Sequence, residues 1–252
     1  MQGTALITGA ADRIGAAIAA RLAAEGHPVV IHYRSSGEKA DLLADAIRAD
    51  GGQADVVHAD LARREDRMGL IAAAAEPFGP LTVLVNNASL FQPDSVDTLH
   101  EDLWDLHMAL HAEAPLFLAR DFAAQLPEDV GGNIINIIDE RVLHPTPDFF
   151  SYTLSKSILW TATRTLAQSL APKIRVNAIG PGPTIKSIHQ TEEDFQALTA
   201  KLPLKAGPTP EEIAEGVVSI MTLPSMTGQM LTLDGGEHLA WPPKNAPTPR
   251  TQ

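Results

Sequence analysis

The sequence predicts a single α/β domain with a doubly wound parallel sheet and helices on both of its faces. Strand-like apolar runs alternate with helical patterns from the N-terminus onward, which is typical of consecutive βαβ units. The longest apolar runs, such as Val83–Val85 and Ile134–Ile138, have the length of a strand and are too short to cross a bilayer. A chain of 252 residues fits one large domain, and nothing in its composition suggests two. In such a sheet, ligands bind at the carboxyl ends of the strands.

The elements follow one another along the whole chain. The expected strands are Ala5–Thr8, Val29–Tyr33, Ala54–His58, Leu81–Asn86, Asn133–Ile138, Ile174–Ile179 and Met230–Leu233. The expected helices are Arg13–Glu25, Glu38–Ala49, Arg64–Ala75, Asp102–Gln125, Ser151–Leu170 and Glu211–Thr222. We expect a domain over residues 1–241 and an extended, Pro-rich tail over 242–252. Residues 181–210 show no clear strand, and we expect a substrate loop there because long loops in compact domains are usually functional.

Charge and cysteine content narrow the possible partners. The formal net charge is −12, and an acidic surface repels phosphate backbones and anionic lipids, so we expect no nucleic-acid or membrane partner. The chain has no cysteine, which excludes disulfides, thiol catalysis and Cys-ligated zinc, and its histidines show no metal-ligand spacing. Strand residues begin at Thr4 without a preceding basic and apolar stretch, so we expect no secretion signal and a cytoplasmic location.

A glycine-containing turn, Thr8–Gly15, lies directly between the first strand and the first helix. Glycine allows the backbone to approach a pyrophosphate, whose charge is stabilised at the helix N-terminus. The alternative is an ordinary tight βα turn. Its place after the first strand of a βαβ series favours a dinucleotide site.

The end of the second strand indicates which dinucleotide binds. An acidic residue there would bind the free 2′-hydroxyl of NAD, but the sequence has no carboxylate before Glu38. Arg34 and Ser35 can instead hold a 2′-phosphate through charge-assisted hydrogen bonds, which favours NADP(H) over a merely solvated arginine. Asp60, after the third strand, is placed to accept from the adenine amine.

Tyr152 and Lys156 lie four residues apart in a helical pattern, so their side chains share one face. A lysine cation beside a phenol stabilises the phenolate. We therefore expect Lys156 to lower the pKa of Tyr152 and to make it a proton donor near neutral pH.

An ordered set of motifs over about residues 4–236 resembles the short-chain dehydrogenase/reductase family. The motifs are the turn Thr8–Gly15, Asn86-Asn87-Ala88, the Tyr152/Lys156 pair, Arg175-Val176-Asn177 and Asp234-Gly235-Gly236. The resemblance implies a seven-stranded Rossmann sheet, hydride transfer from a nicotinamide, proton transfer by Tyr152 and a homotetramer. With the residues argued above, it gives the following cofactor-binding positions: Gly9, Arg13, Ile14, Tyr33, Arg34, Ser35, Asp60, Leu61, Asn87, Ala88, Ser89, Tyr152, Lys156, Pro181 and Gly182.

Three departures from the common family pattern resemble one branch, the pteridine reductases and bacterial dihydromonapterin reductases. Arg13 stands for the middle glycine of the turn, and Asp139 for the serine thirteen residues before the tyrosine. His111 stands for the helix asparagine that holds a proton-relay water. In that branch the arginine contacts cofactor and pterin, and an aromatic residue, here Phe91, stacks on the pterin.

The branch also implies the roles of the site residues. The catalytic set carries over to Asp139, Tyr152 and Lys156, and the substrate-binding set to Arg13, Ser89, Phe91, Asp139 and Tyr152. His111 is either a packed helix histidine or a proton carrier in place of the water relay. Phe91 is alternatively a loop anchor, and Arg13 alternatively contacts phosphate alone.

Asp139 favours this branch on physical grounds as well. An ionised carboxylate would repel a ketone oxygen as negative charge develops on it, but it would attract a substrate with N–H donors or a protonated ring nitrogen. Beside Tyr152 it also opposes ionisation of both groups, so the two should titrate as a coupled pair. Asp139 capping the following turn is the plainer alternative.

We therefore predict an NADPH-dependent reductase of a dihydropterin or a related N-heterocycle. One alternative is a carbonyl reductase in which burial keeps Asp139 protonated. Another is a cofactor-binding regulator without catalysis, which the intact Tyr152 and Lys156 argue against.

Overall fold

The computed structural model describes residues 3–187 and 190–239, and a single parallel sheet organises them. Within these residues seven strands have the order β3-β2-β1-β4-β5-β6-β7, so the direction of winding reverses between β1 and β4. The strands are β1 (Thr4–Ile7), β2 (Val29–Tyr33), β3 (Ala54–His58), β4 (Leu81–Asn86), β5 (Gly132–Ile137), β6 (Ile174–Pro181) and β7 (Met230–Leu233). The predicted doubly wound sheet is confirmed, and its reversal opens the crevice in which such folds bind ligands.

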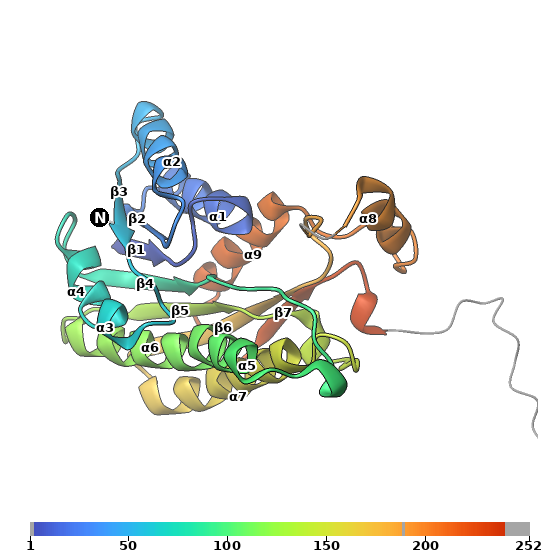
Figure 1. The fold of residues 1–252 in the computed structure, drawn as a ribbon. Coiled ribbons are helices and arrows are strands. Elements are labelled where there is room, and N and C mark those ends of the chain that lie inside the picture. The colour runs from blue at the N-terminus through green and yellow to red at the C-terminus, as the bar shows by residue number, and fades with distance from the viewer. Residues whose placement is uncertain (1–2, 188–189, 240–252) are drawn as a thin grey trace, which may run out of the picture.

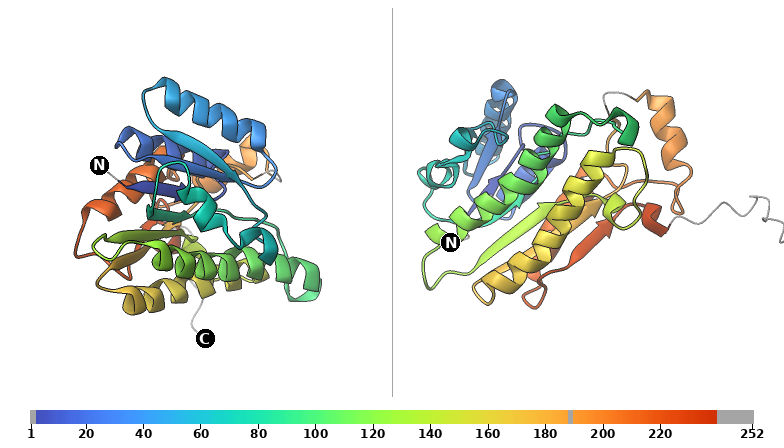
Figure 2. Two further views of the ribbon diagram at one scale, coloured as in Figure 1. Left: turned by 90° about the vertical axis from the view of Figure 1, so that its left-hand side faces the viewer. Right: turned by 60° about the horizontal axis from the view of Figure 1, so that its bottom comes forward.

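Helices cover both faces of the sheet (Figures 1 and 2). One layer consists of α1 (Arg13–Ala24), α2 (Gly37–Ala49) and α9 (Pro210–Thr222). The other layer includes α4 (Leu70–Ala75), α6 (Ala114–Gln125) and α7 (Phe150–Leu170), with α5 (Glu101–His107) beside α7.

Alternation along the strands explains this arrangement. In β1, Leu6 packs into the core under α6 and α7, while Ile7 packs into the core under α1 and α9. Val30 and Ile31 divide between the two cores in the same way. Successive strand side chains point to opposite faces, so a continuous apolar run requires a cover on both sides.

Two expected helices are interrupted. The expected helix over Arg64–Ala75 is split into α3 (Arg64–Arg67) and α4, because Gly69 adopts a left-handed φ of 86° between them. The expected helix over Asp102–Gln125 contains a π-helical segment, η2 (Met108–Glu113), between α5 and α6. Pro115 follows this segment and has no N–H to donate to the carbonyl of His111 in an α-helical register.

The expected substrate loop over 181–210 contains a helix that the pattern analysis missed. This helix, α8 (Glu192–Thr199), begins at a capping box in which the Thr191 hydroxyl accepts from the Asp194 N–H at 3.1 Å. The Thr-x-x-Asp pattern was visible in the sequence. The predicted tail over 242–252 lies outside the described residues.

Candidate active site

The turn after β1 packs tightly against the end of β4 and against the first turn of α1. Gly9 has a φ of 61°, and a Cβ added there would lie 2.8 Å from the Cα of Ala88. Asp12 caps α1 by accepting the Arg13 N–H at 2.8 Å. Gly15 lies in the first turn of α1 and is equally confined, because an added Cβ would meet the Gly9 carbonyl oxygen at 2.6 Å. The close backbone packing and the helix N-terminus fit the phosphates of a dinucleotide.

Arg13 occupies the family's middle-glycine position with a φ of 56°, a conformation that L side chains rarely adopt. The backbone at this position therefore retains the glycine geometry. The guanidinium donates to the carbonyl oxygens of Ile185 and Lys186, each at 3.3 Å. Arg13 thus joins the phosphate turn to the predicted substrate loop, and the next residue, Ile14, packs partly into the core.

The end of β4 is hydrogen-bonded to this turn. The Asn87 side-chain amide donates to the carbonyl oxygens of Thr8 at 2.8 Å and Gly9 at 3.0 Å. The Thr8 hydroxyl accepts the backbone N–H groups of Asn87 and Ala88 at 2.9 and 3.0 Å. These bonds hold the β1 and β4 ends together at the point where the sheet reverses direction.

The residues predicted to bind the adenosine ribose and its 2′-phosphate lie at the exposed end of β2. Arg34 and Ser35 are exposed between β2 and α2 and are free to meet a 2′-phosphate. Tyr33 is partly buried, with its ring against His58 at 5.4 Å. Beyond β3, Asp60 accepts the Ala62 N–H at 3.0 Å.

Some predicted cofactor residues have buried side chains. Leu61 is part of the core, so only its backbone can line the crevice. At the end of β6, Pro181 is buried, and the Gly182 N–H donates to the Leu233 carbonyl oxygen at 2.9 Å. A Cβ at Gly182 would lie 2.7 Å from the Cα of Asp234, so close packing requires glycine there.

His32 is a buried site residue that the sequence analysis did not select. The Gly9 N–H donates to its Nδ1 at 3.0 Å, so Nε2 carries the hydrogen and donates to the Ala59 carbonyl oxygen at 3.0 Å. Burial lowers the pKa of His32 to about 4. The neutral ring therefore joins the glycine turn to the ends of β2 and β3. Its only sequence signal is a histidine at the end of an apolar strand.

Tyr152 and Asp139 form the central contact of the site. The Tyr152 hydroxyl donates to Oδ2 of Asp139 at 2.8 Å, while Oδ1 of Asp139 accepts the Arg141 N–H at 3.0 Å. Asp139 therefore caps the short helix η3 (Glu140–Val142) and also binds the tyrosine. Tyr152 is buried, but 19% of the Asp139 side chain is exposed, so a ligand can reach its carboxylate.

The expected effect of Lys156 on Tyr152 is wrong in this structure. Burial, together with the charge of Asp139 and the hydrogen bond to it, raises the pKa of Tyr152 well above its usual value. The Lys156 ammonium lies 5.7 Å from the centre of the tyrosine ring and donates to the Ile137 carbonyl oxygen at 2.9 Å. Burial lowers the pKa of Lys156 to about 8. The expected coupling of Tyr152 with Asp139 agrees with the direction of the tyrosine shift.

Both ring nitrogens of His111 make hydrogen bonds within the chain. Its Nε2 accepts the Leu90 N–H at 3.1 Å and lies 3.0 Å from the Ser89 hydroxyl. Its Nδ1 must then carry the hydrogen, which it donates to the Ser155 hydroxyl at 2.8 Å. Burial lowers the pKa of His111 well below its usual value. These contacts support the packed histidine rather than the proton carrier, and they fix the loop that leads to Phe91.

Phe91 lies beside Tyr152, and one face of its ring is already covered by another residue of the chain. Its ring meets the Tyr152 ring edge-on at 4.9 Å and stacks on Phe149 at 4.1 Å with planes 12° apart. The Arg141 guanidinium lies 5.9 Å from the centre of the Phe91 ring and 5.1 Å from that of Phe149. The predicted substrate-stacking position therefore holds an aromatic ring of the chain itself.

Phe149 and Arg141 are the site residues that the sequence analysis missed. Phe149 precedes α7 with a φ of 56°, a strained conformation that is common at functional sites. Arg141 places Nε 3.9 Å from Oδ1 of Asp139. Their signals were an aromatic residue close before the tyrosine and an arginine two residues after Asp139.

Three polar side chains hold the start of α7. The buried Asp94 accepts the Ser151 N–H at 3.1 Å, and the Ser151 hydroxyl also donates to it. His107 contacts the same hydroxyl through Nδ1 at 2.7 Å. An anionic cap at the N-terminus of α7 fixes the helix whose first turn carries Tyr152.

Acidic side chains adjoin the other side of Asp139. Glu140 is buried, and burial together with the charges of Glu237 and Asp139 raises its pKa to about 8. Glu237 belongs to η4 (Glu237–Leu239), which packs against η3.

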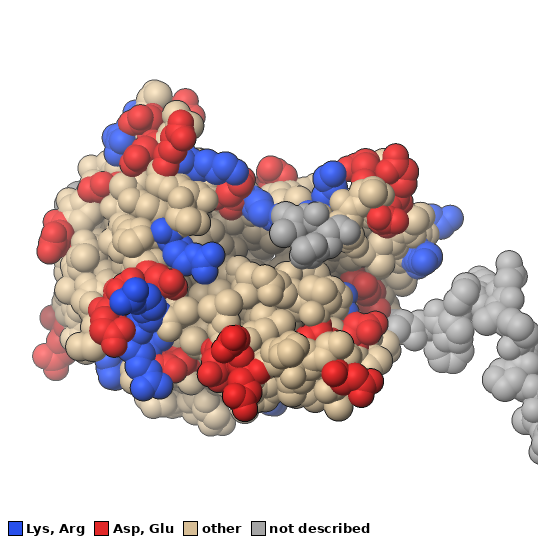
Figure 3. Space-filling view, viewed as in Figure 1, with Lys and Arg blue, Asp and Glu red and all other residues tan. Residues whose placement is uncertain are grey.

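In the space-filling view, Lys and Arg side chains lie at the rim of a central hollow, between acidic side chains over α2 and over α8 (Figure 3). Positive charge is therefore concentrated locally on a strongly acidic surface.

Fold and site together define a class. A parallel sheet that reverses after β1, a glycine turn at that point and a tyrosine–lysine pair beside it form a nicotinamide-dinucleotide oxidoreductase site. The sequence model of the family described as "Enoyl-(Acyl carrier protein) reductase" matches residues 9–238, and the chain belongs to the short-chain dehydrogenase/reductase family. The predicted short-chain oxidoreductase is thereby confirmed.

Individual relatives resemble the chain over nearly its whole length. An uncharacterized oxidoreductase of Methylorubrum extorquens is 36% identical and aligns over 92% of this chain and 96% of that protein. The crystal structure of FolM Alternative dihydrofolate reductase 1 from Brucella suis in complex with NADP has 51% sequence identity to this chain and a TM-score of 0.92. The match covers 95% of this chain and 96% of the Brucella suis chain. The corresponding protein from Brucella canis, also complexed with NADP, has 51% sequence identity and a TM-score of 0.93. That match covers 96% of this chain and 97% of the Brucella canis chain.

Proposed function

We propose that the chain is an NADPH-dependent reductase of a dihydropterin or a related N-heterocycle. The observation that carries this proposal is the 2.8 Å hydrogen bond from the Tyr152 hydroxyl to Asp139. Burial raises the pKa of both groups, so the pair retains a proton near neutral pH beside a carboxylate that a ligand can reach. A tyrosine–carboxylate pair of this kind suits a substrate that must gain a proton on nitrogen.

Each residue of the site has a separate role in the proposed reaction. NADPH supplies the hydride when bound. Tyr152 holds the proton to be transferred, and Asp139 orients a ring with N–H donors by accepting from them. Lys156 places its ammonium between the Ile137 carbonyl and the tyrosine ring, where its charge offsets that of Asp139. Phe91 offers a ring face for stacking once Phe149 has moved away.

The cofactor is NADP(H) rather than NAD(H). Arg34 and Ser35 are exposed at the end of β2, and no carboxylate stands there to bind a free 2′-hydroxyl. Gly9 and Gly15 leave room for the pyrophosphate at the start of α1. Two similar structures from Brucella are complexed with NADP, which supports the same choice here.

A carbonyl reductase is the second candidate, and one observation favours it. Burial raises the pKa of Asp139, and a protonated Asp139 would donate to a carbonyl as the family's serine does. A dihydropterin fits better, because the carboxylate accepts from both the tyrosine and the Arg141 N–H and so keeps an acceptor character.

The test is NADPH oxidation with dihydrobiopterin, dihydromonapterin, dihydrofolate and a panel of ketones and diketones. We expect the largest kcat/KM with a dihydropterin. A clear preference for ketones would replace the proposal with the second candidate. NADPH binding without turnover of any compound in the panel would indicate the non-catalytic regulator, and it would contradict both enzyme proposals.

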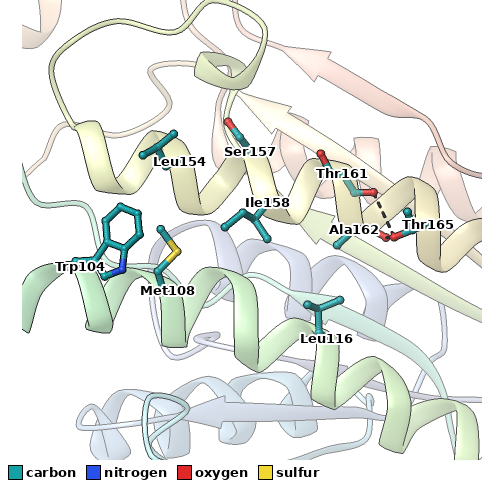
Figure 4. Close-up of a pocket in the computed structure, with 9 residues that line it drawn as sticks. All are labelled: Trp104, Met108, Leu116, Leu154, Ser157, Ile158, Thr161, Ala162 and Thr165. Atoms are coloured by element: carbon teal, nitrogen blue, oxygen red, sulfur yellow. Dashed lines mark hydrogen bonds between the residues drawn. The ribbon is translucent and has the colours of Figure 1, made fainter. Parts of the chain in front are cut away.

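We further propose that the chain assembles with copies of itself through the outer face of α7. An open groove of about 570 Å³ lies between α7 and the α5–α6 layer, and apolar side chains such as Trp104, Leu154 and Ile158 line it (Figure 4). Leu154 and Ile158 are exposed on the side of α7 opposite Tyr152, as expected for an interface. The predicted tetramer is tested by light scattering of the wild type and of Ile158→Glu, which should dissociate it; a monomeric wild type would refute it.

Among the described residues, no helix combines the length and apolar character needed to cross a bilayer. The cytoplasmic location stays a prediction.

A further inference from the structure

The N-terminus of α1 presents an electrostatic conflict. Asp12 is its N-cap residue, and 55% of the Asp12 side chain is exposed. The hydrogen bond from Lys39 lowers the pKa of Asp12, so the carboxylate is ionised in neutral solution. The same helix end is the place where a dinucleotide places its phosphates. An unneutralised carboxylate there would repel the cofactor.

Lys39 resolves this conflict from a different element. Its ammonium donates to Oδ2 of Asp12, although 27 residues separate the two along the chain. Lys39 lies in the first turn of α2, which begins directly after Arg34, Ser35 and Ser36 at the end of β2. The ion pair therefore spans from the phosphate turn to the segment expected to hold the adenosine ribose.

The other charged side chains near this ion pair are poorly placed to neutralise Asp12 in place of Lys39. The Arg13 guanidinium is directed to the loop carbonyls of Ile185 and Lys186. Apart from Lys39, the exposed charged residues in the first half of α2 are acidic, Glu38 and Asp41. With 60% of its side chain exposed, the Lys39 ammonium can reach a ligand while it still contacts Asp12.

We propose that Lys39 determines cofactor specificity: it masks the Asp12 carboxylate and brings a second positive charge, beside that of Arg34, to the 2′-phosphate of NADP(H). The inference rests on the proposed cofactor. A purely structural ion pair is the alternative, but an exposed pair of this kind contributes little to the stability of a fold. The two roles therefore predict different effects of removing Lys39.

The test is the dissociation constants of NADPH and NADH, measured by titration for the wild type and four variants. Lys39→Ala should weaken NADPH binding about thirtyfold, because it loses a charge-assisted contact to the 2′-phosphate and also unmasks Asp12. It should weaken NADH binding only about threefold, because NADH carries the pyrophosphate that Asp12 repels but not the 2′-phosphate. Arg34→Ala should show the same selectivity. Arg48→Ala removes an equal charge from the far end of α2, where Arg48 pairs with Asp45, and should leave both constants unchanged.

The double variant Asp12→Asn/Lys39→Ala tests the masking directly, since asparagine keeps the cap but has no charge. It should bind NADPH at least threefold more tightly than Lys39→Ala alone. Equal losses for NADPH and NADH in Lys39→Ala, or a lower melting temperature with unchanged binding, would overturn the inference. No recovery in the double variant would overturn the masking. A wild type that binds both cofactors equally would instead refute the proposed cofactor itself.

Discussion

The Tyr152 hydroxyl and the Asp139 carboxylate share one hydrogen bond of 2.8 Å, although thirteen residues separate them in the chain. The bond joins the first turn of α7 to the segment after β5, and it directs the tyrosine proton to a carboxylate instead of to solvent. Burial raises the pKa of both groups, and the charge of Asp139 adds to the shift of Tyr152, so the tyrosine holds its proton more firmly than usual. The chemistry of the site therefore depends on the pair and not on the tyrosine alone.

Replacing Asp139 should change substrate choice. Asp139→Ser removes an anionic acceptor and a proton-transfer group, so kcat/KM for a dihydropterin should fall tenfold or more, while activity on a reactive diketone stays level or rises. The measurement is the ratio of the two kcat/KM values in wild type and variant. Tyr152→Phe should abolish both activities and serves as the control. If the ratio stays constant, Asp139 does not select the substrate.

The two stacked phenylalanines should have opposite effects on substrate binding. A ring cannot enter between Phe91 and Phe149 at a centroid separation of 4.1 Å, so a planar substrate that stacks on this face of Phe91 must displace Phe149. Phe91→Ala should therefore raise KM for a dihydropterin about tenfold, with little change in NADPH affinity. Phe149→Ala should leave KM unchanged or lower it. Equal increases in KM would show instead that both rings simply support the loop, as would a drop in melting temperature with unaltered kinetics.

His32 should make the fold sensitive to acid. The pKa of His32 is about 4 in the folded chain and near 6.5 in the unfolded chain, so the unfolded state binds more protons between these values. The contribution is fully present above pH 6.5 and falls as the pH drops towards 4, by about 3 kcal/mol at most. Urea unfolding at pH 7.5 and 4.5 measures it. His32→Asn should show a smaller difference than the wild type, whereas the exposed His100→Asn should match the wild type.

Glu140 should give the stability of the fold the opposite pH dependence from that of His32. Its pKa is raised from 4.5 to about 8 in the folded chain, so its proton stabilises the fold at low pH, and that stability is lost as the pH rises towards 8. Glu140→Gln keeps the neutral shape. It should exceed the wild type in free energy of unfolding by on the order of 3 kcal/mol at pH 8.5, and match it near pH 4.5. A constant difference between the two proteins at both pH values would contradict the prediction.

Local patterns along the chain determined the fold class and the main candidates of the site. Continuous apolar strands require helices on both faces, so the doubly wound sheet followed from periodicity and composition. The four-residue spacing of Tyr152 and Lys156 placed both on one helix face, and the turn around Gly9 was recognisable from its place after β1. Each of these features depends on residues that are close together in sequence.

The tertiary structure decided what depends on contacts between distant segments. The tyrosine pKa is raised because the fold buries the hydroxyl against Asp139 and turns Lys156 toward Ile137. Phe149 covers Phe91 from 58 residues away, and Lys39 meets Asp12 across two elements. Burial, dielectric environment and non-local pairing exist only once the chain has folded, and they set which groups hold a proton, which ring face is free and which charge is neutralised.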